Sequence, residues 1–289
     1  MKYFEYSEPA SLDEASALLQ QSSGQASLMA GGTDLMVQMK EHVCSPSRVI
    51  NIKKIPGLDD FEYSPVHGLR IGALVTTREI ETSEIAQSHY ASLARASTDF
   101  ASIQVRNRAT VVGNVCRASP SADTLPALIA DDAVLQIFGS SGRRSCKVED
   151  FFQGPGRTKL GSDEIVTHIG IPAPAARTGK AYIKHGRRSQ MELATVGVAV
   201  RVTLDSSGKV SDVAVVLAAV APGPLRSHQA EAALKNQLPT NALIAEAGRA
   251  AASDSKPISD VRASADYRRE MVRVLTERAL HQAIQEAKQ

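Results

Sequence analysis

Tryptophan is absent from this 289-residue chain, cysteine is rare, and neither charge of one sign nor a long apolar run stands out. A net charge of +2 gives no electrostatic case for binding nucleic acid or an anionic membrane. No apolar run approaches the roughly 18–20 residues that span a bilayer, so we expect no membrane insertion. The start of the chain, MKYFEYSEPASLDE, lacks the basic and then apolar regions of a secretory signal. These absences favour a cytoplasmic protein. The length of 289 residues fits one large domain or two ordinary ones.

The three cysteines, Cys44, Cys116 and Cys146, lie far apart, which is typical of reduced thiols and not of a disulfide framework. The chain has no CxxC pair, HExxH, GxSxG, GxxxxGK(S/T) or GxGxxG pattern. A metal site, a serine hydrolase, a P-loop ATPase and an ordinary Rossmann site therefore have no support. No nucleophile stands at a recognisable spacing from a base, so redox chemistry would require a bound cofactor.

Strands and helices are expected to alternate over the first hundred residues. Three short strands are predicted, at residues 26–30, 48–55 and 69–76. Helix signals are capping-box spacings at Ser11 with Glu14 and at Thr76 with Glu79, and helical periodicity over residues 89–103. This alternation is an α/β pattern.

The rest of the chain indicates two hairpins, a linker and a helical end. A hairpin with a Gly-Ser-Ser-Gly turn is predicted over residues 133–148, and a further strand over 164–172. Proline, alanine and glycine in PAPAARTGKA predict a linker at 172–181. Two long strands flank Asp205-Ser206-Ser207-Gly208, and helical stretches follow at 227–237, 240–253 and 264–287. A sheet followed by helices indicates a small α+β domain.

Two short segments combine small residues with Thr, Asp or Asn: Ala30-Gly31-Gly32-Thr33-Asp34 and Ala109-Thr110-Val111-Val112-Gly113-Asn114. Uncovered backbone N–H groups in such segments form a concave anion site that suits a pyrophosphate. Glycine also permits a positive φ and the close approach of a ligand. A simple strand-to-helix turn would give the same pattern, so the residues alone leave both explanations open.

Three longer stretches carry a family resemblance: LMAGGTDLMVQMK, FASIQVRNRATVVGNVCRASPSADTLPALIADDA and AYIKHGRRSQMELATVGVAV. They resemble the FAD-binding medium subunit of molybdenum hydroxylases, the family of xanthine dehydrogenase and carbon monoxide dehydrogenase. The resemblance runs the full length. The segments FFQGPGRTKLGSDEIV, MELATVG and RASADYRREM are most similar to bacterial xanthine dehydrogenase-type flavin subunits.

The resemblance implies an α+β fold with two domains. Residues 1–175 would form a two-part FAD-binding domain of the vanillyl-alcohol oxidase type, with subdomains of approximately 1–57 and 58–175. Residues 176–289 would form a C-terminal domain of the CO dehydrogenase flavoprotein type, with an antiparallel sheet and helices.

The resemblance also implies cofactor-binding residues. The first segment would hold the FAD diphosphate through Leu28, Met29, Ala30, Gly31, Gly32, Thr33, Asp34 and Leu35. The other implied contacts are Phe100, Ala101, Ala109, Thr110, Gly113, Asn114, Asp123, Ile165 and Lys184. Asp123 would lie near the polar chain of the cofactor, and Ile165 and Lys184 near its flavin end. Many relatives have two glycines where this chain has Val112-Gly113, so the valine departs from the family pattern.

Several of these residues have ordinary structural explanations as well. Asp123 could cap the helix TLPALIA, Lys184 could be a solvated strand lysine, and Phe100 could belong to the core. Arg106 and Arg108 could steer an anion or form a solvated basic face.

In the family, substrate is oxidised at a molybdenum cofactor on a large subunit, and electrons pass through 2Fe-2S clusters on a small subunit to FAD on the medium one. This chain lacks the cysteines that a cluster needs. The resemblance therefore implies a medium subunit with no catalytic residue and no metal of its own, in a dimer of heterotrimers. Its FAD would reduce NAD⁺ or another acceptor. A purine or related N-heterocycle is the expected substrate, with an aldehyde or CO as alternatives. A stand-alone FAD oxidoreductase and an assembly subunit without FAD are the competing hypotheses.

Overall fold

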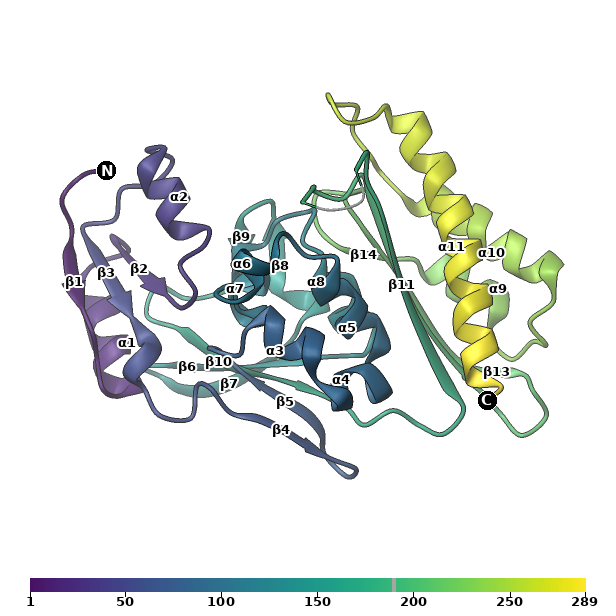
Figure 1. The fold of residues 1–289 in the computed structure, drawn as a ribbon, viewed down its shortest axis with the longest axis horizontal. Coiled ribbons are helices and arrows are strands. Elements are labelled where there is room, and N and C mark those ends of the chain that lie inside the picture. The colour runs from purple at the N-terminus through teal and green to yellow at the C-terminus, as the bar shows by residue number, and fades with distance from the viewer. Residues whose placement is uncertain (189–190) are drawn as a thin grey trace.

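A computed structural model describes residues 1–188 and 191–289. The three larger sheets follow one another along the longest axis of the molecule, from the N-terminal part on the left of Figure 1 to the C-terminal helices on the right. The fold mixes helices and sheets in two domains, and the first domain consists of two parts. In the described part of the chain, no helix is both long and apolar enough to cross a membrane.

The first part is a small parallel sheet with the strand order β1-β3-β2. Its elements are β1 (Glu5–Ser7), α1 (Leu12–Gln21), β2 (Ala26–Met29), α2 (Leu35–Lys40) and β3 (Arg48–Asn51). The Ser11 side chain accepts the Glu14 N–H, so α1 begins where the sequence predicts. The strand predicted over 48–55 is half as long as expected. Asn51 accepts the Lys53 N–H with its side chain and turns the chain into a 3-10 helix, η1 (Ile52–Lys54).

The second part is an antiparallel sheet with the order β4-β5-β10-β6-β7. Its strands are β4 (Phe61–Ser64), β5 (Gly68–Gly72), β6 (Val134–Gly139), β7 (Gly142–Lys147) and β10 (Ile165–Ile171). The predicted hairpin over 133–148 is confirmed by β6 and β7. The strand predicted over 69–76 ends early, at Gly72, because the chain turns there and the Val75 N–H donates to the Gly72 carbonyl.

Helices α3 to α8 lie above this sheet in Figure 1. They are α3 (Thr77–Thr82), α4 (Glu84–His89), α5 (Ala91–Thr98), α6 (Ile103–Arg106), α7 (Val111–Arg117) and α8 (Thr124–Ala130). The capping box predicted at Thr76 and Glu79 is present at the start of α3. The helix predicted over 89–103 is shorter than expected. It ends at Thr98, and Ala101 takes a left-handed φ of 45°, which no α-helix tolerates.

A few short elements complete this domain: η2 (Glu149–Phe151), β8 (Phe152–Gly154) and β9 (Arg157–Thr158). The second domain is an antiparallel sheet, β11 (Thr178–His185), β12 (Val196–Leu204), β13 (Val210–Ala218) and β14 (Leu225–Arg226), packed against helices α9 (His228–Leu234), α10 (Asn241–Asp254) and α11 (Ala265–Ala287). The hairpin around 205–208 and the three helices are as predicted.

The predicted linker at 172–181 is partly wrong, because β11 already begins at Thr178. Residues 178–181 pair with residues 200–203 of β12. A Cβ atom on Gly179 would lie 1.9 Å from the Ala283 carbonyl oxygen, so this glycine lets α11 pack directly on the strand. The end of this segment is therefore an edge strand, held by contacts with β12 and α11 that its own sequence does not indicate.

Helix α8 joins the two domains. All seven of its residues are buried. The apolar core of the first domain continues through this helix onto one face of the second sheet, where it includes Tyr182, Ala199, Ala214 and Val216. The other face of that sheet forms a separate core with α9, α10 and α11. Residues of the second domain are thereby fixed against the first.

Candidate functional site

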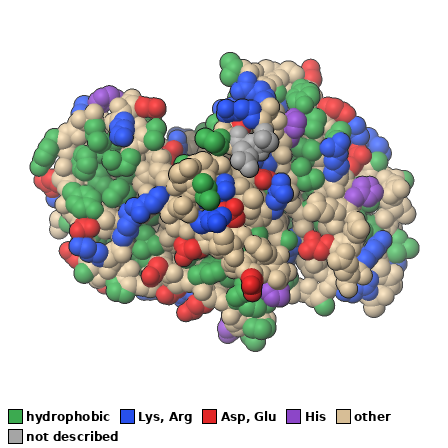
Figure 2. All heavy atoms as spheres, in the orientation of Figure 1, with side chains coloured by type: hydrophobic (Ala, Val, Ile, Leu, Met, Phe, Trp, Pro, Cys, Tyr) green, Lys and Arg blue, Asp and Glu red, His purple; other side chains and the backbone are tan. Residues whose placement is uncertain are grey.

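A cavity of about 910 Å³ is lined by the first two parts of the chain and by the segment after β11. Its volume lies near the upper end of the roughly 300–1,000 Å³ range of ligand pockets. In Figure 2 the surface is hollowed between the left-hand lobe and the rest of the molecule. All of the predicted cofactor residues except Lys184 line this cavity. The structure therefore brings together residues that are up to 137 positions apart, from Leu28 to Ile165.

The first glycine segment leaves β2 and enters α2 along the cavity wall. Gly31 packs against the backbone at the start of the second segment, since a Cβ atom there would lie only 1.9 Å from the Arg108 carbonyl oxygen and 3.0 Å from the Ala109 Cα atom. Gly32 has a φ of 73°, in the left-handed region. Within the described part of the chain, the N–H groups of residues 31–35 donate to no protein acceptor. This wall therefore presents a run of unused donors to the cavity.

The second segment has less bared backbone than the sequence suggested, because three of its N–H groups donate within the fold. Thr110 caps α7, and its side chain accepts the Gly113 N–H at 3.0 Å. The Val111 N–H donates to the Val75 carbonyl at 3.2 Å, and the Asn114 N–H to the Thr110 carbonyl at 3.0 Å. Val112, the departure from the family pattern, is buried in the core and also lines the cavity. The expectation of a second nest of free N–H groups therefore fails at Val111, Gly113 and Asn114, because the helix cap and two backbone carbonyls use these three donors.

Asp123 is a buried carboxylate held by the second domain. It accepts hydrogen bonds from the Tyr182 hydroxyl and the Lys184 ammonium group, each at 3.0 Å. It makes no side-chain cap to α8, so the capping explanation is wrong. Burial raises the pKa of Asp123 to about 6, although Lys184 and Tyr182 act in the opposite direction. The solvated explanation for Lys184 is also wrong, because its side chain is only 9% exposed.

The two arginines that precede the second segment, Arg106 and Arg108, differ from each other. The Arg106 side chain is 13% exposed and pairs with Glu81 at 2.8 Å. It belongs neither to a solvated basic face nor to an anion-steering surface. Arg108 is exposed. Phe100, which could have been a core residue, is only half-buried and lies on the cavity wall.

Some lining residues were not predicted. Arg117, at the end of α7, forms an ion pair with Asp34 at the start of α2 and so bridges the two parts of the first domain. Other unpredicted lining residues come from Leu160 to Glu164 and from Met191 to Leu193. The stretch FFQGPGRTKLGSDEIV pointed to the first group, but nothing in the local pattern identifies Arg117, since its partner is 83 positions away.

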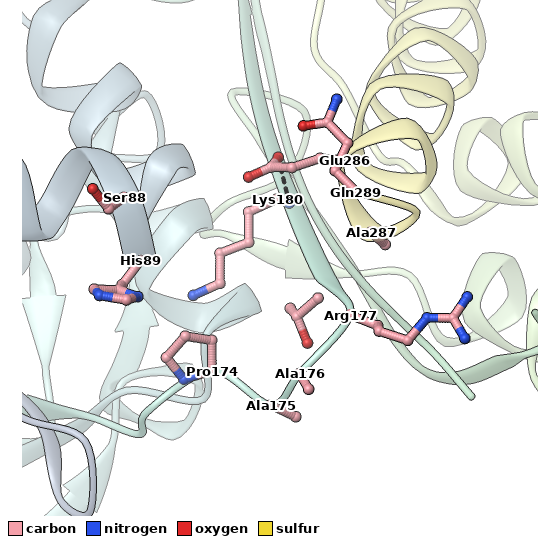
Figure 3. A pocket seen from close by; sticks show the side chains of 11 residues that line it. Ser88, His89, Pro174, Ala175, Ala176, Arg177, Lys180, Glu286, Ala287 and Gln289 are labelled. Carbon is pink, nitrogen blue, oxygen red and sulfur yellow. Dashed lines mark hydrogen bonds between the residues drawn. The ribbon is translucent and has the colours of Figure 1, made fainter. Parts of the chain in front are cut away.

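A smaller cavity, of about 410 Å³, lies between α4, the connection before β11 and the end of α11. Figure 3 shows Lys180 reaching from β11 toward the side of the cavity formed by His89 and Pro174. Its ammonium group pairs with Asp131 at 2.8 Å and lies 4.4 Å from the centre of the Tyr90 ring. Burial lowers the pKa of Lys180 and raises that of Asp131. The opposite charges attract each other across the two domains, although neither Asp131 oxygen has a well-oriented hydrogen-bond donor among the described residues.

The described residues contain no group of three or more His, Cys, Asp or Glu side chains that could hold a metal ion. All three cysteines are free thiols. Burial raises the pKa of the Cys116 thiol, in the cavity wall, to about 12. The cavity therefore offers hydrogen-bond donors, a buried carboxylate and apolar walls, which suit an elongated phosphate-bearing ligand.

Residues 2–174 match the family described as FAD binding domain in molybdopterin dehydrogenase. Residues 181–283 match the CO dehydrogenase flavoprotein C-terminal domain. The chain is 32% identical over 281 residues to a putative xanthine dehydrogenase FAD-binding subunit of Escherichia coli strain K12, covering 96% of this chain and 95% of the relative. It is 36% identical over 282 residues to the carbon monoxide dehydrogenase medium chain of Hydrogenophaga pseudoflava, covering 97% and 96%.

Solved structures agree with these matches. Carbon monoxide dehydrogenase from Hydrogenophaga pseudoflava, in a form that lacks the Mo-pyranopterin moiety, aligns with a TM-score of 0.94 at 36% identity over 99% of this chain and 98% of the other. Quinoline 2-oxidoreductase from Pseudomonas putida 86 aligns with a TM-score of 0.92 at 26% identity over the whole of both chains.

Proposed function

Because the chain belongs to the family of FAD-binding medium subunits of molybdenum hydroxylases, we propose that it holds FAD in the larger cavity and relays electrons within a multi-subunit oxidoreductase. The observation that carries the proposal is the run of unused N–H donors at residues 31–35 beside this cavity. A diphosphate is an acceptor of matching charge and size. An assembly subunit that had lost its cofactor would have no need to keep these donors unpaired.

We assign the remaining contacts by their place on the cavity wall. Residues 28–35 would face the diphosphate, and Asp123 would face the polar chain of the cofactor. The other proposed contacts are Phe100, Ala101, Ala109, Thr110, Gly113, Asn114 and Ile165. Lys184 would act through Asp123, because its ammonium group bonds that carboxylate and Lys184 does not line the cavity.

The chemistry of the complex would be divided between chains. When bound, FAD would supply the redox step, taking electrons one at a time from 2Fe-2S clusters on a partner and passing them to NAD⁺ or another acceptor. This chain's residues would bind and orient the cofactor and exclude water around it. No acid or base on this chain is needed for substrate oxidation.

We propose that the partners are a large molybdenum-cofactor subunit and a small 2Fe-2S subunit, in a cytoplasmic dimer of heterotrimers. The relatives named above are subunits of xanthine and carbon monoxide dehydrogenases, which supports this division of labour. A purine or related N-heterocycle is the proposed substrate of the complex, and an aldehyde or CO is the alternative. We place the domain boundary at 175–176, between the two matched regions, and the subdomain boundary near 57–58.

The test is to purify the chain alone and with the products of the adjacent genes, and to record a visible spectrum of each. We expect a yellow protein with stoichiometric FAD and no turnover of substrate without its partners. A colourless chain that still assembles would contradict the FAD proposal. A yellow chain that oxidises substrate alone would favour the stand-alone oxidoreductase.

A further inference from the structure

Three consecutive carbonyl groups after α5 each accept a hydrogen bond from a cationic side chain. The Asp99 carbonyl accepts from the Lys184 ammonium group at 3.0 Å. The carbonyls of Phe100 and Ala101 accept from one terminal nitrogen of Arg106, at 2.9 and 3.4 Å. Charged donors make stronger hydrogen bonds than neutral ones. The path of this turn is therefore held by two side chains, Arg106 from the nearby α6 and Lys184 from the distant β11.

The turn needs such support. Ala101 has a φ of 45°, a left-handed conformation that is strained for a residue with a Cβ atom. Strained backbone persists only where the surroundings hold it in place. Phe100 and Ala101 both line the larger cavity, whereas Arg106 does not. The guanidinium group thus lies behind the wall that these two residues form.

Arg106 is itself fixed from several sides. Its Nε atom donates to Glu81 at 2.8 Å, and the Glu81 side chain is only 12% exposed. Arg78 also pairs with Glu81, at 2.9 Å. The Thr77 hydroxyl donates to the Arg106 carbonyl at 3.3 Å. The start of α3, which the Thr76 capping box determines, therefore sets the position of the guanidinium group.

We propose that Arg106 is a positioning residue for the cofactor: it holds the Phe100–Ala101 wall in the conformation that receives FAD, with Glu81 as its orienting partner. This inference rests on the proposed FAD site. Arg106 touches the cavity only through the two carbonyls, so its effect is to preorganise the wall before the cofactor arrives. Loss of Arg106 would leave a folded chain whose wall samples other conformations.

The experiment compares Arg106→Gln and Arg106→Lys with the matched control Arg108→Gln, which removes an exposed arginine two positions away. The full chain is co-produced with its partner subunits and stripped of flavin. FAD is then titrated back, and the circular dichroism of the bound flavin is recorded. Hydrogen exchange of residues 99–105 is followed in the flavin-free protein, which reports on the wall independently of the cofactor.

We expect Arg106→Gln to raise the Kd for FAD by about tenfold, the equivalent of one charged hydrogen bond, and to alter the flavin dichroism and speed exchange in the turn. Arg108→Gln should leave all three unchanged. Arg106→Lys keeps the positive charge, but its single nitrogen cannot bond Glu81 and the two carbonyls at the same time. It should therefore recover only part of the affinity for FAD. If Arg106→Gln fails to fold, the same comparison is made with Arg106→Lys and Glu81→Gln, which should weaken FAD binding by smaller factors.

Unchanged Kd, dichroism and exchange in the folded Arg106 variants would overturn the inference while leaving the FAD site intact. A lower melting temperature with unchanged flavin dichroism and exchange would assign Arg106 a purely structural role and would also overturn it. A wild-type protein that takes up no FAD would instead overturn the proposed function on which the inference rests.

Discussion

Gly31 and Gly32 are adjacent, but each must be glycine for a different physical reason. At Gly31 a Cβ atom would overlap the Arg108 carbonyl, with a separation of 1.9 Å. At Gly32 a Cβ atom would meet the flexible Met29 and Met36 side chains at 3.4 and 3.7 Å, but the φ of 73° disfavours any other residue. The first glycine joins two cavity walls, and the second turns the backbone so that its N–H groups stay free.

These reasons predict different costs for the two alanine variants. Gly32→Ala should lower the free energy of unfolding by only about 1 kcal/mol, the cost of a left-handed alanine. Gly31→Ala should cost more and should abolish FAD binding, because the two segments cannot separate without opening the cavity. Thermal unfolding and FAD titration measure both effects. Gly223→Ala is the control, since a Cβ atom there meets nothing closer than 3.9 Å.

A more severe change at Gly32 tests the site itself. Gly32→Val should abolish FAD binding while the second domain stays folded, because a β-branched residue is strongly disfavoured at positive φ. Equal stability of Gly31→Ala and Gly223→Ala would contradict the packing argument. Stoichiometric flavin in Gly32→Val would mean that the segment is an ordinary turn with no role in FAD binding.

Asp123 should titrate far above an ordinary aspartate. Its pKa rises from 3.8 to about 6 because burial disfavours the charged form. Between these values the folded, flavin-free chain holds a proton that the unfolded chain releases. The contribution of Asp123 to the free energy of unfolding therefore falls as the pH rises through this window, and the ion pair with Lys184 is complete only above pH 6.

Carbon-13 NMR of the Asp123 carboxyl group in the flavin-free chain measures this directly, with an expected midpoint near pH 6. Lys184→Met should move the midpoint higher, since the ammonium group lowers the pKa of Asp123. A midpoint near 4 would mean that water reaches the carboxylate. A lower midpoint in Lys184→Met would contradict the ion pair.

At the scale of elements, the start of α7 is fixed by one side chain. Thr110 caps the helix, and the flanking backbone pairs with the start of α3, where the Thr77 N–H donates to the Ala109 carbonyl at 2.9 Å. Thr110→Val keeps the shape but loses the cap, so it should lower the free energy of unfolding by about 1 kcal/mol. Thr110→Ser should be nearly neutral. Urea unfolding of the flavin-free chain distinguishes them, and equal midpoints would contradict the capping role.

Local signals predicted the elements that depend on neighbouring residues. The caps at Ser11 and Thr76 and the hairpin around Asp205 follow from side-chain chemistry within three or four positions, and each is present. The beginning of β11, inside the predicted linker, was missed, because the residues that define it are the ladder partners on β12. The strand predicted at 48–55 ends early for a local reason, since the Asn51 side chain accepts the Lys53 N–H and starts a 3-10 helix.

The same distinction applies to the cavity. The glycine-rich composition of both segments pointed to this wall, and the family resemblance placed further residues on it. Arg106 could not be assigned from its neighbours, because its partner Glu81 lies 25 positions away and only the folded chain brings the two together. At Thr110 the sequence was misread for a local reason. Its hydroxyl accepts the Gly113 N–H, a donor that the sequence had suggested would be free.

At the scale of the whole molecule, α8 docks the two domains through charges of opposite sign. Asp132, just after this helix, pairs with Arg201 at 2.6 Å and Arg226 at 3.1 Å on the second sheet. The neighbouring Asp131 pairs with Lys180. Asp123, before the helix, bonds Lys184 of the same sheet. Acidic groups of the first domain thus meet basic groups of the second at both ends of α8, and the same docking fixes one wall of the cavity.

The Asp131–Lys180 pair is the most buried of these contacts, with side chains 2% and 3% exposed. Removing one member of such a pair strands the other charge, so Lys180→Met should lower the free energy of unfolding by about 3–5 kcal/mol. The double variant Lys180→Met with Asp131→Leu replaces both charges with apolar groups and should recover most of this loss. Denaturant unfolding of the three proteins measures the difference.

The pH dependence of the stability of Lys180→Met is an independent test of the same ion pair. Burial already raises the pKa of Asp131, and the Lys180 charge opposes that rise. In Lys180→Met, the pKa of Asp131 in the folded chain should rise further, because the opposing charge is gone. In the unfolded chain Asp131 takes up a proton only in acid. The stability deficit of Lys180→Met should therefore shrink as the pH falls from 8 toward 5, and the double variant should show no such change. A stability deficit that does not change with pH would mean that Asp131 finds another partner. If Lys180→Met were as stable as the double variant, the ion pair would not hold the domains together.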